Sequence, residues 1–474
     1  MMGRSDTAPA PDAGPAGAPA ELRLRAAAPL PPLRPVTDFV GLPTGDGSLS
    51  LQSRQAIVEG GAVCWAVGCV GVGALGARSL AGLVTWPYAL VLLALVVGVP
   101  GGLAALRTLA LLLADPPAVA HVRPNTPVTV VVPAADPATT VAMLVAVAAQ
   151  DHDGVVRVVA RADTDPGSAR AAAVAARDLR LALDTIPSMP GHAADWRNAA
   201  LLRVATPLVL TLAPGTCLHP SALRLLVARL ESCPPATVGV AGHLLIRNQR
   251  RTTSAEALAR AWTFELDAHQ RAEALLTGPL VADGSCTLFR TDALRAVNGW
   301  PTIEARDVVV TWRCLERGWT ITSEPQALAF TATAVTSATP GRERAGARHR
   351  VRAAARESGG TTRLARRASR VMARIDRARP AFDVLCSLAW VQALVLAGFG
   401  QVSLVGGYLL LVAPVSLAGL ALERRQHREV LDEAGLTLAH PPHRWRAALA
   451  TLDPFQAVVG TWGLLTRRRL RSTP

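Results

Sequence analysis

The sequence predicts an α/β domain placed between two pairs of membrane-spanning helices, and three observations carry this prediction. Half of the 474 residues are hydrophobic and only 18% are charged, which excludes a disordered protein and a small disulfide-rich scaffold. Two long stretches without charges, 81–106 and 384–422, lie far apart in the chain. Between them, runs of β-branched residues alternate with stretches long enough for helices, as in parallel α/β sheets.

The N-terminal part divides into a tail and a first membrane hairpin. Residues 1–56 are rich in Ala, Pro and Gly and show no apolar periodicity, so we expect a disordered tail. Residues 61–77 carry no charge, and after Arg78 the stretch 81–106 is also uncharged. A bilayer core requires roughly 20 apolar residues per helix. The sequence therefore predicts two membrane helices over 57–113.

The second apolar block predicts another hairpin. Residues 384–422 are too many for one membrane helix and fit two helices over 383–422, with a glycine-containing tip at 398–401. Helices of this composition are alternatively the buried core of a soluble protein. A shorter apolar stretch, 455–466, ends in three arginines and predicts an interfacial helix within a C-terminal tail, 423–474.

All 49 basic residues are arginines, which gives a net charge of +14. The segment 341–380 holds 13 of them against three acidic residues. It has no interleaved aromatic residues, so it does not fit nucleic-acid binding. It fits interface helices over 336–382 that lie on anionic lipid headgroups. Under the positive-inside rule, these arginines predict a multi-pass protein of the cell (inner or plasma) membrane whose central domain, 114–335, and both termini are cytoplasmic.

Four β-branched runs predict strands of the central domain: 128–132, 155–159, 208–212 and 238–241. Helices are expected over 139–150 and 193–204. In such sheets, ligands bind at the carboxyl ends of the strands. No GxGxxG or GxxxxGK[ST] motif follows any of these strands, which disfavours a dinucleotide-binding fold and a P-loop enzyme. The seven cysteines form no CxxC pair, which argues against a zinc site.

The order of short phrases along the chain resembles that of a known family. A membrane hairpin precedes a strand that ends in Val-Val-Pro, and a second hairpin closes the series. The phrases between them are Arg197-Asn198-Ala199-Ala200-Leu201, Gly284-Ser285-Cys286-Thr287-Leu288-Phe289-Arg290, Asn298-Gly299-Trp300 and Thr311-Trp312-Arg313. Over about residues 57–470, this order resembles the membrane-embedded family 2 glycosyltransferases of the cellulose, chitin, hyaluronan and poly-N-acetylglucosamine synthase type.

The resemblance implies a cytoplasmic GT-A-like (Rossmann-like) domain that moves a hexosyl group, with inversion, from a nucleotide-diphosphate sugar to a glycan or lipid-linked acceptor. The implied partners are the nucleotide sugar, anionic membrane lipids and other membrane proteins of a glycan synthesis complex, but no nucleic acid. In that family a DxD carboxylate pair holds Mg²⁺ or Mn²⁺ on the diphosphate. A separate Asp is the general base, and a QxxRW phrase contacts the diphosphate and the acceptor sugar.

Two acidic motifs of the family are changed in this sequence. The metal-binding pair should follow strand 208–212, but the chain reads Ala213-Pro214-Gly215-Thr216. We therefore expect the Mg²⁺/Mn²⁺ site to be lost and name no certain cofactor. The acidic pair that contacts the nucleoside falls on Ala160-Arg161. Asp163 and Asp165 follow shortly after, and either cap a loop or bind the nucleoside.

The other candidate site residues also come from the resemblance. Asp307, preceded by Arg306, occupies the position of the general base; the alternative interpretation is a salt-bridged Asp at a helix start. Pro133 and Asn198 lie in phrases that match the family's nucleotide-sugar-binding segments. Arg350 is the one residue that matches the QxxRW phrase.

Three hypotheses of function follow. The first is an active glycosyltransferase that works without a metal, with Arg161, Arg306 or Arg350 neutralising the leaving group. The second is a pseudoenzyme, in which the same fold serves as a partner or regulator in polysaccharide synthesis or export. The third is a lipid-surface scaffold unrelated to sugars.

Overall fold

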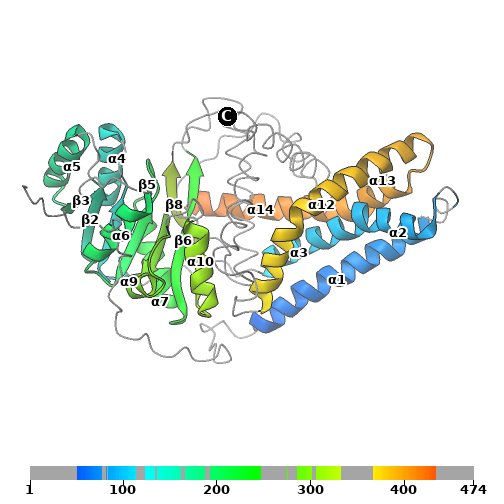
Figure 1. Cartoon of the computed structure of the whole chain (residues 1–474), viewed down its shortest axis with the longest axis horizontal. Helices are drawn as coiled ribbons and strands as arrows, with labels where there is room; N and C mark the ends of the chain where they lie inside the picture. Colours follow the sequence, from blue (N-terminus) through cyan, green and yellow to red (C-terminus); the bar gives the residue numbers. More distant parts are fainter. Residues whose placement is uncertain are drawn as a thin grey trace, which may run out of the picture.

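The computed structural model places a bundle of long helices beside an eight-stranded sheet, with helix α14 reaching from one to the other (Figure 1). The residues that it describes are 51–76, 82, 84–113, 123–133, 136–161, 166–186, 193–246, 275, 286–301, 306–331 and 367–433.

The first hairpin of the bundle begins earlier than its sequence predicts. Helix α1 (Leu51–Gly76) starts inside the region expected to be a tail. Its first turns have partners outside the helix: Arg54 donates to the carbonyl of Leu113 at 3.3 Å, and Gln55 donates to the carbonyl of Leu275 at 2.9 Å. These long-range bonds order residues whose local composition alone does not specify a helix. The returning helix consists of three segments: α2 (Trp86–Leu93), the π-helical η3 (Ala94–Gly98) and α3 (Val99–Leu113).

The second hairpin also extends beyond its predicted ends. Helix α12 (Arg367–Gly398) runs unbroken across the expected boundary at 382/383, so the end of the arginine-rich segment and the first apolar stretch form one helix. The tip lies at the predicted residues, where Gly400 adopts a φ of +87°, a conformation that glycine accepts without strain. The returning segments are α13 (Ser403–Gly407), the π-helical η5 (Tyr408–Val412) and α14 (Ala413–Glu433). The expected tail after residue 422 therefore begins as the last turns of α14.

Three helices of the described part are long and apolar enough to cross a bilayer: Ser53–Leu75, Trp86–Leu113 and Ser403–Asp432. The apolar part of α12, Val384–Gly398, is shorter than a typical span. Large exposed apolar side chains concentrate on these helices. Among the described residues, all such side chains lie on the bundle except Val145, Val155, Val174 and Leu202.

The sheet is mixed, with strand order β3-β2-β1-β4-β7-β6-β8-β5. The strands are β1 (Val128–Val132), β2 (Val156–Arg161), β3 (Ala182–Ile186), β4 (Leu208–Leu212), β5 (Cys217–Leu218), β6 (Thr237–Ile246), β7 (Cys286–Arg290) and β8 (Thr320–Thr331). β3, β2, β1 and β4 are mutually parallel, and β6 is parallel to β8. β7 is antiparallel to both of its neighbours, and β5 is antiparallel to β8.

Helices cover both faces of this sheet, each over its own apolar core. The first face carries α4 (Pro137–Ala148), α5 (Pro166–Asp178) and α7 (Ala222–Ser232), with Val128, Val130 and Val132 pointing into that core. The second face carries α6 (Ala193–Arg203), α9 (Thr291–Ala296) and α10 (Arg306–Glu316), with Val131 pointing the other way. The predicted α/β architecture is confirmed, and β1 and β4 occupy the predicted residues.

Helix α14 joins the bundle to the sheet. Near its middle, the Glu423 carboxylate forms an ion pair with Arg107 of α3, with 2.7 Å between Nη2 and Oε2. At its far end, Val430 and Leu431 pack with Leu245 of β6 and Leu328 of β8. The joint lies near the carboxyl ends of β6 and β8, so the helical bundle approaches the sheet close to the edge where ligands bind in α/β folds.

Candidate functional site

The candidate site lies at the carboxyl edge of the parallel strands. Val132 pairs with Ala160 and Val131 pairs with Thr211, so the next residues of the three strands, Pro133, Arg161 and Ala213, stand nearly level. Pro133 is buried at the end of β1, and Arg161 is half-buried at the end of β2. The structure therefore brings two sequence-predicted residues, Pro133 and Arg161, to one edge.

Asp307 also lies at this edge, in the first turn of α10. This helix leads into β8, which is parallel to β6, so its N-terminus faces the carboxyl edge. The positive end of the helix dipole favours a carboxylate there. The Asp307 side chain is 32% exposed, and its Oδ1 lies 3.3 Å from Nη1 of Arg197. Asp307 is thus salt-bridged, as the structural interpretation of the sequence requires. It is also accessible, as a general base must be.

Arg197 is a residue of the site whose role the sequence did not indicate. It lies on α6, and its side chain is only 7% exposed. Its guanidinium carbon lies 5.8 Å from the ring centre of Trp196 and 5.9 Å from that of Trp300. Cation–π contacts of this kind stabilise a desolvated arginine. Two indoles and one carboxylate therefore hold this guanidinium in place.

Asn198 fixes the turn that carries Trp300. Its Nδ2 donates to the Trp300 carbonyl at 2.8 Å, and its Oδ1 accepts from the Trp300 amide at 2.9 Å. Gly299 has a φ of +59°, and a Cβ at that position would collide with Asn198 Oδ1. The side-chain amide of Asn198 thus binds the backbone of the Asn-Gly-Trp phrase and supports one wall of the Arg197 slot, and its contact with a nucleotide sugar stays a prediction.

The loop after β4 does not fit a divalent metal. Residues Ala213–Thr216 form a turn closed by a 3.2 Å bond from the Thr216 amide to the Ala213 carbonyl. They offer no carboxylate, the side chain through which proteins usually bind Mg²⁺ and Mn²⁺. Within the described ranges, no cluster of three His, Cys, Asp or Glu side chains is placed to hold a metal ion.

A sequence profile of the glycosyltransferase-like family 2 matches residues 123–360, which cover this whole edge. The chain belongs to this family. The sheet topology and the family together make the domain α/β with a GT-A-like fold. No curated protein matches the chain significantly.

Several solved glycosyltransferase structures are similar to this family 2 chain. The mannosyltransferase PcManGT from Pyrobaculum calidifontis, in complex with GDP-Man and Mn²⁺, is 18% identical, with a TM-score of 0.49 over 71% of this chain and 98% of that chain. Glucosyl-3-phosphoglycerate synthase from Mycobacterium tuberculosis, in complex with UDP, is 14% identical, with a TM-score of 0.33 over 50% and 81%. TarS 1–349 from S. aureus is 14% identical, with a TM-score of 0.37 over 65% and 90%.

Three of the candidate residues predicted from the sequence, Asp163, Asp165 and Arg350, lie outside the described residues, as does the stretch 455–466. Of Arg306 the structure describes the helical backbone only.

Cys314, on the same helix as Asp307, does not fit the role of a nucleophile of the candidate site. Complete burial raises the pKa of its thiol to about 12, and a thiol is a strong nucleophile only as the thiolate. It packs in the core beneath α10.

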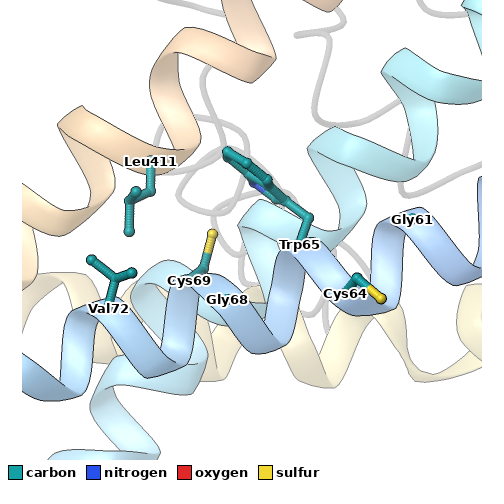
Figure 2. A pocket seen from close by; sticks show the side chains of 7 residues that line it. All are labelled: Gly61, Cys64, Trp65, Gly68, Cys69, Val72 and Leu411. Carbon is teal, nitrogen blue, oxygen red and sulfur yellow. The ribbon is translucent and has the colours of Figure 1, made fainter.

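A hollow of about 330 Å³ lies on the other part of the molecule, against α1 and η5. Figure 2 shows Cys69 and Val72 of α1 below Leu411 of η5, and the Trp65 ring of α1 beside Leu411. Its lining contains no charged side chain, so it supplies none of the acid–base or diphosphate-binding groups that sugar transfer requires.

Proposed function

We propose that this family 2 protein is a membrane-embedded glycosyltransferase that transfers a hexosyl group from a nucleotide-diphosphate sugar to a glycan or lipid-linked acceptor. The observation that carries the proposal is the position of Asp307. A partly exposed carboxylate stands at the carboxyl edge of the sheet and is held there by a buried arginine. A general base requires accessibility and a fixed orientation together.

The proposed step uses Asp307 as the base. Its carboxylate accepts the proton of an acceptor hydroxyl while that oxygen attacks the anomeric carbon of the donor. The new glycosidic C–O bond forms as the bond to the diphosphate oxygen breaks, and the nucleoside diphosphate leaves with both electrons. Arg197 stays bonded to the carboxylate and sets its direction.

A titration with UDP- and GDP-sugars, with and without Mn²⁺, tests this function on the detergent-solubilised chain. We expect a donor to bind and its sugar to be transferred. Asp307→Asn should then lower turnover by 100-fold or more and leave donor affinity within about twofold, because the amide cannot accept the proton at neutral pH. Retained turnover in this variant would remove Asp307 from the mechanism.

A pseudoenzyme that supports glycan synthesis or export is the second candidate function. The absence of carboxylates at Ala213–Thr216 favours it, because that loop would otherwise hold the metal. Binding of partner membrane proteins with no transfer from any UDP- or GDP-sugar would establish this alternative over the first.

The proposal places the protein in the cell membrane, with the glycosyltransferase domain and both termini on the cytoplasmic side. The three long apolar helices and their exposed apolar side chains support embedding, and the arginines of 341–380 support the sidedness and contact with anionic lipids. The protein should sediment with membranes and resist extraction by alkaline carbonate, and detergent should release it. Release by carbonate would show a peripheral protein instead.

A further inference from the structure

We propose that Arg161 replaces the metal at the donor site, so that the donor's diphosphate binds to a guanidinium without a divalent cation. This inference rests on the proposed function, because it specifies how the same site meets the charge of its substrate. The fold family implies a metal at the loop after β4, but this loop has no carboxylate to hold one.

The position of Arg161 suits this role. It is the last residue of β2 and pairs with Ile186 of β3. Side chains alternate along a strand, so Arg161 lies on the same face as Val159, which packs in the core beneath α6. The helix that carries Arg197 covers this face as well. Two arginines and one carboxylate, Asp307, therefore share one face of the carboxyl edge.

Among the described residues at this edge, Arg161 and Thr216 each have a buried side-chain atom with no hydrogen-bond partner. One is Nε of Arg161, and the other is Oγ1 of Thr216, a residue that is fully buried in the turn after β4. Leaving a buried polar atom unbonded costs roughly 1–3 kcal/mol, so such atoms point to a ligand that completes them. β2 and β4 flank β1, which places Arg161 and Thr216 on either side of Pro133.

The charges at this edge favour an anion. Arg197 and Asp307 neutralise each other, which leaves the positive charge of Arg161 uncompensated among the described side chains of this face. Asp136 lies on the opposite face, where its carboxylate caps α4 by accepting from the Thr139 amide at 3.2 Å. A guanidinium can bind phosphate oxygens in a bidentate manner, and this supplies the neutralisation that a metal would otherwise give.

The test measures binding of inorganic pyrophosphate, UDP and GDP to the full detergent-solubilised chain by calorimetry in EDTA, and again with Mn²⁺. We expect binding in EDTA that Mn²⁺ does not strengthen. Arg161→Gln should weaken it by tenfold or more, and Thr216→Val by a few-fold. The matched control is Arg157→Gln. Arg157 lies on the same face of β2 as Arg161, but four residues closer to the amino edge of the sheet. The Arg157→Gln variant should therefore bind pyrophosphate, UDP and GDP with wild-type affinity.

Two results would overturn the inference: loss of all binding in EDTA, or wild-type affinity in a folded Arg161→Gln variant. Thermal unfolding verifies the fold, and if this variant fails to fold, Arg161→Lys retains the charge without Nε and should bind with intermediate affinity. Transfer activity distinguishes the two proposals. Metal-free binding through Arg161 without sugar transfer would support this inference and reject the proposed enzyme. Sugar transfer that Arg161→Gln leaves unchanged would support the proposed enzyme and reject this inference.

Discussion

At the scale of single residues, the candidate site is a series of side-chain contacts that ends at Asp307. Asn198 holds the backbone of Trp300, the rings of Trp300 and Trp196 flank Arg197, and Arg197 bonds the carboxylate. Each member limits the movement of the next. The carboxylate of Asp307 is thus the partly exposed end of a series whose other members are buried or half-buried, an arrangement that keeps a side chain in one direction.

Asn198→Ala tests this series of contacts. The variant loses two hydrogen bonds to Trp300 and should destabilise the chain by about 1–3 kcal/mol, with a lower melting temperature. Since Asn198 acts through Trp300 and Arg197, turnover should fall while donor affinity stays within about twofold. Asn125→Ala, at an exposed position, is the control and should change neither. A weakened donor affinity at unchanged stability would instead return Asn198 to the donor-binding role predicted from its sequence phrase.

The sequence could predict Asp307 but not the residue that holds it. Asp307 lies in a recognisable phrase near a helix start, whereas Arg197 is one of 49 arginines. What distinguishes Arg197 is burial between two tryptophans and a contact with a residue 110 positions away. This environment forms only when α6, α10 and the turn at 298–300 come together in the fold. A local sequence pattern therefore cannot predict the burial of Arg197.

At the scale of elements, prediction succeeded where a segment is buried on both faces. β1 and β4 are continuous β-branched or apolar runs at the centre of the parallel half, and every residue in them is buried. β3 is an edge strand with mostly exposed residues, so its composition gives no strand signal. The ends of α1, α12 and α14 were missed because tertiary contacts, and not hydrophobicity, extend these helices past the apolar stretches.

At the scale of the whole molecule, α14 makes the bundle and the sheet one unit. Its polar contacts with α3 include the Arg107–Glu423 ion pair, a 3.2 Å bond from Thr108 Oγ1 to the Val415 carbonyl, and a 3.1 Å bond from Gln426 Nε2 to the Leu111 carbonyl. Beyond them, His427 meets His243 of β6 with ring centres 5.5 Å apart. The helix therefore holds the carboxyl edge of β6 and β8 at a fixed place relative to the bundle.

Arg107→Met tests this connection. Glu423 is only 2% exposed, so removal of its cationic partner leaves a nearly buried carboxylate with less compensation. We expect a loss of about 1–2 kcal/mol in unfolding free energy in detergent, below the usual cost for fully buried pairs, because Arg107 itself is 41% exposed. The double variant with Glu423→Gln should lose less than the sum of the two single variants.

The matched control for this experiment lies on the same helix. Arg425 and Glu429 form an exposed pair at 3.0 Å, and Arg425→Met should cost less than about 0.5 kcal/mol. Equal losses in the Arg107 and Arg425 variants would show that the buried pair does not connect the bundle to α14 more strongly than a surface pair.

The contact between α14 and the sheet also sets the order in which the protein can be completed during synthesis. β6 and β8 leave the ribosome long before Val430 and Leu431, the residues that cover Leu245 and Leu328. Until then these strands present an apolar surface to the chaperones of the cell, and such unfinished surfaces are prone to aggregate. The α/β domain thus reaches its final state only after helix α14 has been made, so its maturation depends on a segment that follows it in the chain.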